Sequence, residues 1–462
     1  MAYYKMPGRE IALEADWDVI VAGGGPAGCA AATAAAREGA KTLLIEATGM
    51  LGGMGTAGLV PWFCGYHDRE KIIARGLAER VLHGLADGMP HLKAALEANP
   101  LAQPAIAPEL LKRIYDDMVT GAGVEVRLHS HICSVEMSGR DEVDAVIVAD
   151  KSGLRACRAR IFVDCTGDGD LAAWAGAAFE KGDESGAMQP GTHCFVICSI
   201  DEEALAKGPK VHYFDPESPI WKAMKSGKYP LIDDLHSCSI KIGPGVYGFN
   251  TGHLFGVDNT DPVGVSKAMM LGRKMAAQYR DAFAEYLPAF ANSWLAATGS
   301  LMGARETRRI LGDYMLTMED YAERRSFPDE ICRNAYGIDV HCSRETSRQM
   351  TQMSIEQLKQ QNKKLTQKLS KGESFGVPYR CLTPKGLRNV LVAGRCISAD
   401  RPVNGSVRIM ACCLNTGEAA GIAAAHALGQ DYNVHAVDAA QVREKLKAFG
   451  GYLPDAAANA GT

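Results

Sequence analysis

The pattern of apolar and polar positions is most regular near the start of the chain, where two apolar runs enclose an alanine-rich stretch. Residues 19–22 and 43–45 are apolar enough for buried strands. Residues 27–38 have the composition of a helix that ends before Gly39. The order strand, turn, helix, strand is typical of an α/β fold with a parallel sheet.

Further along the first half, the pattern predicts two helices, a set of short strands and a return to the main sheet. Residues 69–88 are amphipathic and helical, and residues 90–108 predict a loop-rich crossing. Residues 108–121 begin with proline and end at glycine, as helices often do. The apolar run at residues 161–165 returns to the main sheet. The alternating segments that suit an antiparallel meander are residues 124–128, 132–137, 143–149 and 154–158.

The pattern changes between about residues 185 and 345, and it changes back near the end. Residues 345–371 are rich in Gln, Lys, Ser and Thr, which predicts an exposed helix or an insertion, with disorder as the alternative. The other predicted elements are strands at 192–200, 245–255 and 389–395, helices at 262–289, 316–325 and 406–428, and a frayed tail at 454–462.

These elements predict an α/β fold in which a doubly wound, Rossmann-like nucleotide-binding domain is discontinuous in sequence. A mixed α+β substrate domain is inserted into it. The expected boundaries are residues 1–184 and 375–450 for the nucleotide domain, with a small β-meander at 124–160, residues 185–374 for the substrate domain, with a polar helical insertion at 345–371, and residues 451–462 for a tail.

Composition and charge exclude several classes of protein. Lys and Arg total 50 against 54 Asp and Glu, so the net charge of −4 gives no electrostatic case for nucleic acid or an anionic membrane. No apolar run approaches the ~18 residues of a membrane span, and the first residues show no signal peptide. The 14 cysteines lack C-x-x-C spacing, so we expect reduced thiols, a cytoplasmic location and no metal site.

The turn after the first strand carries a G-x-G-x-x-G motif in the context that gives it meaning. Gly23 permits a tight turn, Gly25 lets the backbone approach a pyrophosphate, and Gly28 lets the helix pack close to the strand. The helix start offers N–H groups and a partial positive charge to that pyrophosphate. Glu46, at the end of the second strand, is placed to accept hydrogen bonds from a ribose. The motif predicts dinucleotide binding.

Four later segments extend this prediction to FAD. One is a second glycine-rich loop, two follow predicted strands at the edge of the sheet that binds ligands, and the last opens a helix. The positive end of that helix can favour the negative charge that a reduced flavin carries. Each segment alone also fits an ordinary glycine turn at a strand end. The segments are Gly52-Gly53-Met54-Gly55-Thr56, Cys165-Thr166-Gly167-Asp168-Gly169-Asp170, Gly394-Arg395 and Asn404-Gly405-Ser406-Val407-Arg408.

With these motifs the chain resembles the FAD-dependent oxidoreductases of the fumarate-reductase and glutathione-reductase-type superfamily, and most of all a poorly characterised bacterial branch. The resemblance covers both ends of the chain and is weaker in the middle. It implies FAD along the sheet edge, backbone near Ile132 at the adenine, and a flavin ring between the two domains. The segments that carry it are residues 23–28, Glu46, and residues 51–56, 163–170, 377–382 and 391–398.

The motifs and the resemblance together give a set of expected cofactor-binding residues. These are Gly23, Gly25, Pro26, Ala27, Gly28, Glu46, Gly52, Gly53, Met54, Thr56, Ile132, Thr166, Gly167, Asp168, Gly394, Arg395, Ser406, Val407 and Arg408.

Departures from better-known relatives narrow the chemistry. Disulfide reductases carry a cysteine pair soon after the second glycine-rich loop, and here only Cys64 follows it. They also need a second complete G-x-G-x-x-G motif for NAD(P)H, and this chain has none. Relatives with covalent flavin use a histidine near this loop, whereas residues 47–60 contain none. Disulfide reduction is therefore not expected, and FAD is expected to bind non-covalently.

The substrate half offers candidate catalytic residues, each with a structural alternative. Arg305 and either Arg308 or Arg309 have helical spacing and could clamp a carboxylate or phosphate, or they could form ion pairs with Glu306 and Asp313. His253 follows a predicted strand and could be a general acid or base, or a structural histidine. The same alternatives apply to Asp339 and His341. Cys64 and His67 follow the glycine-rich loop and could lie near the flavin, with a plain buried cysteine as the alternative.

The sequence thus predicts a flavoenzyme that transfers a hydride between FAD and a small polar, possibly anionic, metabolite, with Arg305 and His253 as catalytic residues. The direction of the reaction, the electron acceptor or donor and the oligomeric state stay open. One alternative is an electron-transfer flavoprotein subunit that works with a partner protein. An RNA-modifying flavoprotein is a second alternative, which the acidic balance of charge disfavours.

Overall fold

The computed structural model describes residues 4–5, 8–365 and 367–454. Residues 455–462, most of the tail that is expected to be frayed, lie outside this range.

A parallel sheet forms the centre of the fold, which confirms the expected mixed α/β class. Its parallel strands lie in the order β3-β2-β1-β6-β15. The apolar runs that predict strands are fully buried at residues 19–22, 43–44 and 390–392, as expected for a sheet covered on both faces. The bounds are β1 Ala12–Ala22, β2 Thr42–Ile45, β3 Glu125–Arg127, β6 Gly153–Asp164 and β15 Val390–Val392.

Two antiparallel strands extend this sheet past the first half of β6. They are β4 (His131–Met137) and β5 (Val143–Asp150). The expected four-strand meander is wrong in two respects. Residues 125–127 pair in parallel with β2, and the segments expected at 154–158 and 161–165 are one continuous strand, β6. Strand β6 pairs with β5 along its first half and with β15 along its second half. One strand therefore belongs to both the antiparallel and the parallel part of the sheet.

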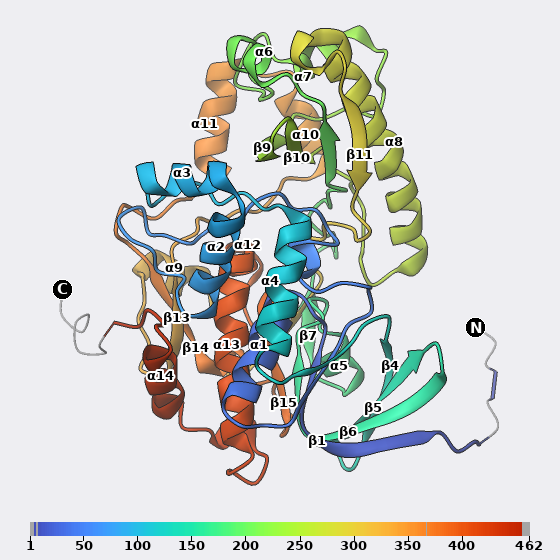
Figure 1. The fold of residues 1–462 in the computed structure, drawn as a ribbon, viewed down its shortest axis with the longest axis vertical. Coiled ribbons are helices and arrows are strands. Elements are labelled where there is room, and N and C mark those ends of the chain that lie inside the picture. Colours follow the sequence, from blue (N-terminus) through green and yellow to red (C-terminus); the bar gives the residue numbers. More distant parts are fainter. Residues whose placement is uncertain (1–3, 6–7, 366, 455–462) are drawn as a thin grey trace.

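Helices α1 (Pro26–Arg37) and α13 (Met410–Ala427) lie side by side on the parallel strands (Figure 1). A Cβ atom on Gly417 or Gly421 of α13 would lie 2.1 Å from the carbonyl oxygen of Ala27 or Ala31 in α1. The small residues of α13 therefore permit a close approach of the two helices. This approach fixes α1, and with it the glycine-rich turn at its start.

Other helices of this half differ from the sequence expectation in their bounds. The helix expected at 69–88 begins only at Leu77, and the expected loop at 90–108 contains a helix begun by Pro90. The single helix expected at 406–428 is two helices, because the chain extends at Ile409. The bounds are α2 Leu77–Gly88, α3 Pro90–Ala98, α4 Pro108–Thr120, α5 Asp170–Trp174, α12 Arg401–Val407 and α14 Ala439–Ala448.

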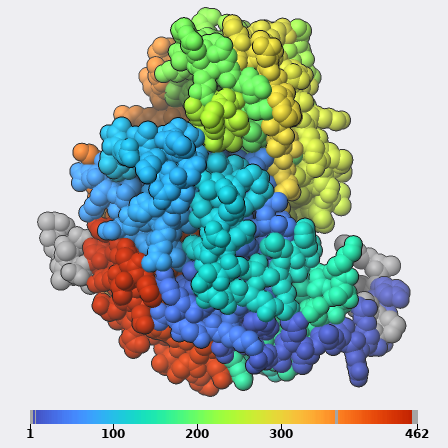
Figure 2. Space-filling model, in the orientation of Figure 1, coloured from blue at the N-terminus to red at the C-terminus, as the bar shows by residue number. Residues whose placement is uncertain are grey.

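A second, antiparallel sheet lies above the first, with strands in the order β11-β8-β10-β9 (Figure 1). It has its own apolar cluster, in which the rings of Phe195 and Phe249 stack at 5.1 Å. In Figure 2 residues near 200–300 form a protruding upper part of the molecule. The bounds are β8 Phe195–Cys198, β9 Ser237–Gly243, β10 Val246–Thr251, β11 Trp294–Thr298, α6 Glu202–Lys207, α7 Pro219–Ser226 and α8 Pro262–Tyr286.

Short elements connect the two sheets. The prediction of a helix around Arg305 is wrong, because residues 308–310 form a strand that pairs with residues 179–181. Apolar side chains between Ile310 and Ile338 belong to the cluster of the main sheet. The bounds are β7 Phe179–Lys181, β12 Arg308–Ile310, α9 Met318–Glu323, β13 Glu330–Asn334 and β14 Phe375–Pro378.

The polar segment expected at 345–371 forms two helices, α10 (Arg344–Met350) and α11 (Ile355–Leu365). Most of its side chains are exposed or half-buried, while Leu358 is fully buried in the cluster of the second sheet. Within the described part of the chain, no helix has both the length and the apolar character needed to cross a bilayer.

Candidate active site

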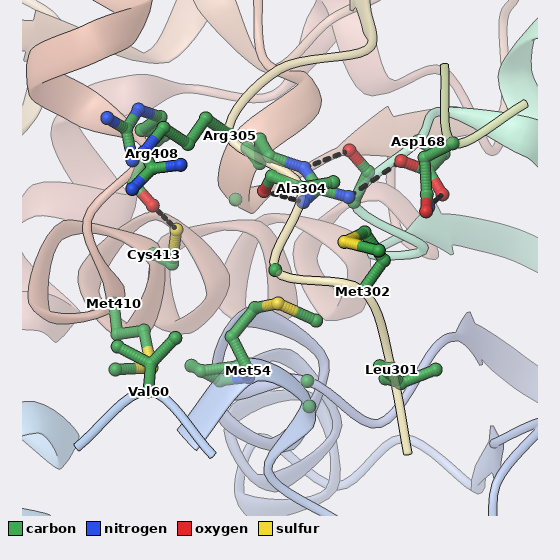
Figure 3. Close-up of a pocket in the computed structure, with 18 of the residues that line it drawn as sticks. Met54, Val60, Asp168, Leu301, Met302, Ala304, Arg305, Arg408, Met410 and Cys413 are labelled. Carbon is green, nitrogen blue, oxygen red and sulfur yellow. Dashed lines mark hydrogen bonds and ion pairs between the residues drawn. The ribbon is translucent and has the colours of Figure 1, made fainter. Parts of the chain in front are cut away.

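A cavity of about 950 Å³ lies where the carboxyl ends of the parallel strands face the second sheet. Loop residues such as Gly23 and Thr166 line its main-sheet side, and His236 and Asn250 line the opposite side. Figure 3 shows Arg305 and Arg408 together at one end of the view, with Met54 and Met410 below them. The cavity therefore combines backbone-rich loops with charged and apolar side chains.

Most of the expected cofactor-binding residues line this one cavity, although they come from distant parts of the sequence. Those that line it are Gly23, Gly25, Pro26, Ala27, Glu46, Gly53, Met54, Ile132, Thr166, Gly167, Asp168, Gly394, Arg395 and Arg408. The other expected residues, Gly28, Gly52, Thr56, Ser406 and Val407, are not among the residues that line it.

The residues outside the lining have contacts within the protein. The Oγ1 hydroxyl of Thr56 donates to the carbonyl of Leu51 at 2.6 Å. The Ser406 hydroxyl donates to the carbonyl of Tyr336 at 2.6 Å, and Val407 is fully buried. These side chains hold loops in place rather than face the cavity.

The helix start that faces the cavity is not the expected one. A helix is expected to begin at residues 404–408, whereas residues 404–407 end α12. Helix α13 begins at Met410, and its first residues, Ile409 and Met410, line the cavity. The partial positive charge of an 18-residue helix thus lies at the cavity wall.

The glycine-rich turn after β1 has the geometry of an anion cradle. No atom lies within 4 Å of the position that a Cβ on Gly25 would take, so Gly25 faces open space in the cavity. A Cβ on Gly28, in contrast, would lie 1.7 Å from the carbonyl oxygen of Gly23. No side chain of the described residues caps the first turn of α1, which leaves its N–H groups available to an anion.

Glu46 joins the first glycine-rich loop to the segment that leads into the second, at the other side of the cradle. Its carboxylate accepts the N–H of Gly24 at 2.6 Å and that of Thr48 at 2.7 Å. The side chain is largely buried but still lines the cavity. Each carboxylate oxygen can accept more than one hydrogen bond, so Glu46 can also accept from a ribose hydroxyl.

Asp168 and Arg395 lie in the cavity wall and bind each other at 2.6 Å. The Arg395 guanidinium also donates to the carbonyl groups of Gly167 and Ala304. Asp168 accepts from Thr307 at 2.8 Å. The loop after β6, the turn after β15 and the segment before β12 are therefore joined at one point.

Arg308 and Arg309 are engaged in ion pairs, so they do not form a clamp with Arg305. The guanidinium of Arg308 lies 2.6 Å from the carboxylate of Asp170, and that of Arg309 lies 3.1 Å from Glu180 and 3.8 Å from Glu306. Both residues form ion pairs, but of the two expected partners only Glu306 takes part, because Asp313 lies 2.6 Å from Nδ1 of His435.

Arg305 and Arg408 bring two guanidinium groups to one end of the cavity (Figure 3). Arg305 is only 6% exposed and donates to the carbonyl of Pro190 at 2.6 Å. Burial, and next the charge of Arg408, lower the pKa of Arg305 to about 10. Arg408 donates to the carbonyl of Asp339 at 3.0 Å, and its Nε has no hydrogen-bond partner among the described residues. The Asp339 carboxylate, which lies 3.4 Å from Nη2 of Arg408, is thus the acidic neighbour of both guanidinium groups.

Three histidines and two aspartates lie beside these arginines. Nε2 of His253 lies 2.7 Å from Nδ1 of His341. Nδ1 of His253 lies 2.7 Å from the Asp234 carboxylate, in a close contact without a well-directed hydrogen bond. The ring of His236 stacks on that of His253 at 4.3 Å. His236 and His341 line the cavity, whereas His253 lies behind them.

Burial controls the ionisation of this cluster. It lowers the pKa of His236 and His253 well below the usual range, and burial with the charge of Arg305 lowers that of His341 to about 4. Burial raises the pKa of Asp234 to about 6. For Asp339 burial acts in the same direction, but the nearby His341 and Arg408 outweigh it and lower its pKa.

The three imidazoles have nitrogen atoms within 4.8 Å of one another, a spacing that a metal ion could bridge. However, Nη2 of Arg305 lies 3.2 Å from Nε2 of His236. A guanidinium group only donates, so this contact uses the lone pair of His236. Its positive charge also opposes a second cation. The arrangement fits a hydrogen-bonded cluster better than a metal site.

Cys64 lines the cavity, and His67 does not. Burial raises the pKa of the Cys64 thiol to about 11, and its sulfur accepts from the indole N–H of Trp62 at 3.2 Å. Burial lowers the pKa of His67, whose Nδ1 accepts from the Arg69 backbone N–H. Cys64 is therefore a neutral thiol, which argues against a nucleophilic role.

Asp234, His236 and Cys238 are not among the residues predicted from the sequence. Asp234 and His236 lie in the loop before β9, and His236 and Cys238 line the cavity. The only local signal is an Asp and a His two positions apart before a strand, which is common in loops. Their grouping with His341, more than 100 residues later, arises from the fold alone.

Comparison with solved structures gives distant similarities. The chain is similar to a geranylgeranyl bacteriochlorophyll reductase-like protein from Thermoplasma acidophilum, with 13% identity, 95% of this chain and 83% of that chain covered, and a TM-score of 0.46. It is also similar to L-proline dehydrogenase from P. horikoshii, with 12% identity, 95% and 100% covered, and a TM-score of 0.42. These scores are too low to carry an argument about function.

Comparison with sequences and family models gives a clearer result. No curated protein matches the chain. A family model described as "FAD dependent oxidoreductase" matches residues 18–446, which include the glycine-rich turn, Glu46, both sheets and α13.

Proposed function

This chain belongs to the family of FAD dependent oxidoreductases, and on that premise we propose that it transfers a hydride between non-covalently bound FAD and a small polar metabolite that carries a carboxylate. The family is FAD dependent, so FAD is the cofactor.

The residues of the main-sheet wall fit the cofactor. Gly25 faces open space at the start of α1, as a phosphate-binding turn requires, and Glu46 is available to a ribose. We assign the cofactor to this wall, including Met54, Ile132 and Gly394. When bound, FAD supplies the hydride chemistry, and the protein supplies orientation and charge.

The observation that carries the substrate class is the pair of guanidinium groups at the other end of the cavity. Arg305 and Arg408 face a single neighbouring carboxylate, Asp339, while the histidines beside them are neutral. Arg308 and Arg395 each have an acidic partner of their own, whereas Arg305 and Arg408 share Asp339. A substrate carboxylate would balance the remaining positive charge. A neutral substrate would leave that charge unbalanced in a buried place.

The group that exchanges a proton with the substrate is then His341. It lines the cavity beside the arginines, whereas His253, the residue expected from the sequence, lies behind it. A histidine whose pKa is lowered to about 4 is neutral at pH 7 and can accept a proton.

We also propose that the two sheets bind different molecules. Residues of the main sheet would hold FAD, and residues from about 192 to 305, with Leu358, would form the substrate side. Two separate apolar clusters support this division. Because apolar residues between 310 and 338 share the main cluster, this substrate part is smaller than the 185–374 expected from the sequence.

Anaerobic addition of hydroxy acids, sugars, amines and NAD(P)H to the purified holoprotein tests the proposal. Bleaching of the flavin absorbance by a carboxylate-bearing donor, lost in Arg305→Ala while FAD stays bound, is the expected result. Bleaching by neutral donors alone would reject the substrate class. Reduction only by a copurifying protein would favour an electron-transfer subunit.

A further inference from the structure

A line of four ionisable side chains leads from the arginine end of the cavity into the interior. Nε2 of His341 lies 3.4 Å from the carboxylate of Asp339, and Nδ1 of His341 lies 2.7 Å from Nε2 of His253. Nδ1 of His253 lies 2.7 Å from the carboxylate of Asp234, which is only 2% exposed, although this close contact is not a well-directed hydrogen bond. The order is therefore Asp339, His341, His253, Asp234, with its last member farthest from the cavity lining.

Counting protons gives this line a specific property. Three contacts join the four groups, and each contact holds at most one bridging proton. Two neutral imidazoles bring two protons, and two ionised carboxylates bring none. The line therefore has room for one additional proton. Its longest contact, at Nε2 of His341, is the one that a group bound in the cavity can replace.

We infer that His341, His253 and Asp234 form a proton relay that takes one proton from the substrate, or returns it, with Asp234 as its buried reservoir. The inference rests on the proposed function, because it needs a substrate group beside His341. His341 touches the substrate, whereas His253 and Asp234 act through it.

The transfer leaves no imidazolium behind. At the start His253 carries its proton on Nδ1, His341 carries its proton on Nδ1, and Asp234 is ionised. A proton arriving on Nε2 of His341 displaces the Nδ1 proton to Nε2 of His253. The Nδ1 proton of His253 then passes to Asp234. One proton has entered, one carboxylic acid has formed, and each of the three contacts now holds one proton.

The surroundings favour this end state. Arg305 lies 3.2 Å from His236, which stacks on His253, so positive charge near the rings disfavours imidazolium. Burial that raises the pKa of Asp234 to about 6 favours its protonated form. Asp339 stays ionised and favours a proton on Nε2 of His341. The ionisable groups that face the relay are Asp233, His236, Tyr279, Arg305, Asp339, Cys342 and Arg408.

Infrared spectroscopy of the holoenzyme tests the reservoir without any ligand. The spectrum should gain a carboxylic acid band as the pH falls through about 6. Burial also raises the pKa of Asp164 to about 6, so the difference between wild type and Asp234→Asn isolates the Asp234 band. In His341→Asn the pH midpoint of this band should shift by about half a unit or more. His193→Asn, a buried histidine outside the line, should leave it unchanged.

Absence of the band, or an equal midpoint in wild type and His341→Asn, would overturn the relay. Asn is uncharged like the neutral imidazole, so a shift in His341→Asn reports the loss of a connection rather than of a charge. Metal analysis of the holoenzyme adds a second check. One equivalent of a metal ion that is lost in His236→Asn and His341→Asn would show that these nitrogens are ligands and would also overturn it.

Oxalate, as a probe anion for the arginine end, tests the link to the cavity. Calorimetry at pH 7 in two buffers of different ionisation enthalpy should show proton uptake with oxalate binding in wild type, because the anion favours a proton on His341. His253→Asn should bind oxalate with little proton uptake. Oxalate binding with equal uptake in both proteins would contradict the relay. Failure of oxalate to bind would count against the carboxylate proposal, while the infrared titration still decides the relay.

Discussion

Asp168 accepts a 2.6 Å hydrogen bond from Arg395, although both belong to motifs that the sequence assigns to cofactor binding. The pair lies in the cavity wall and joins the loop after β6 to the turn after β15. Asn259, in the loop between β10 and α8, donates to the other Asp168 oxygen at 2.6 Å. This loop of the second sheet is therefore held at the same point. The position of the main-sheet side of the cavity relative to the side formed by the second sheet therefore depends on the Asp168–Arg395 pair.

Replacing Asp168 by Asn should therefore lower both stability and FAD retention. The change leaves the largely buried Arg395 without its anionic partner, at a cost of roughly 2–3 kcal/mol. Thermal unfolding and flavin content measure the two effects. Asp144→Asn, which breaks an exposed pair with Arg158, should cost about 1 kcal/mol or less. Equal losses of stability in the two variants would contradict the role of the Asp168–Arg395 pair in joining the loops.

Two alanine substitutions in the glycine-rich turn should separate cofactor binding from folding. Gly25→Ala places a methyl group in open cavity space, so it should weaken FAD binding by about tenfold or more while the apoprotein keeps its stability. Gly28→Ala places a methyl group 1.7 Å from a backbone oxygen and should cost roughly 3 kcal/mol of stability. A stable Gly28→Ala protein, or unchanged FAD affinity in Gly25→Ala, would refute the corresponding assignment.

Arg408→Gln should weaken oxalate binding by roughly 10- to 100-fold. A charged hydrogen bond of about 1.5–3 kcal/mol is lost with the guanidinium group. Titration of the flavin spectrum with oxalate gives the dissociation constant, and the exposed Arg113→Gln serves as the control. If Arg408→Gln lost FAD and kept its oxalate affinity, Arg408 would belong to the cofactor site.

Cys64→Ser should retain activity within about threefold of wild type. With its pKa raised to about 11, the thiol is protonated at pH 7 and cannot act as a nucleophile there. Steady-state turnover and flavin content of the variant provide the measurement. A loss of activity greater than about 100-fold, with FAD retained, would assign Cys64 a chemical role.

Turnover that removes a proton from the substrate should slow as the pH falls through about 6. Below that pH Asp234 already holds a proton and the relay is full; above it Asp234 is ionised and can accept one. The rate should fall about tenfold per pH unit on the acid side. The reverse reaction should have the opposite dependence. Asp234→Asn should remove the fall of the rate on the acid side. If that fall were unchanged in the variant, the titration would belong to another group.

The elements near the start of the chain could be predicted well because their signals are local. The glycine-rich turn, Pro26 at the start of α1 and the apolar strands are defined by residues that are close in sequence. Predictions failed where long-range pairing decides the outcome. Residues 125–127 join β2 in parallel, and the arginine-rich segment at 308–310 forms a strand because it pairs with residues 179–181.

For the candidate site too, residues in local motifs could be predicted, and residues brought together by the fold could not. Gly25 and Glu46 follow from motif spacing and line the cavity. The sequence also singles out Arg305 and His253, but it could not show that Arg408 comes beside Arg305 or that His341 separates His253 from the cavity. Asp234 and His236 have no distinctive sequence pattern. Their chemistry depends on burial and on neighbours from other parts of the chain.

Anaerobic rapid mixing with matched acid and amide donors tests the central claim most directly. The holoenzyme should be reduced by a hydroxy acid at least about 100-fold faster than by the corresponding amide, because only the acid balances the charge of Arg305 and Arg408. This preference should largely disappear in Arg408→Gln. Equal rates for acid and amide in the wild-type enzyme would contradict the account.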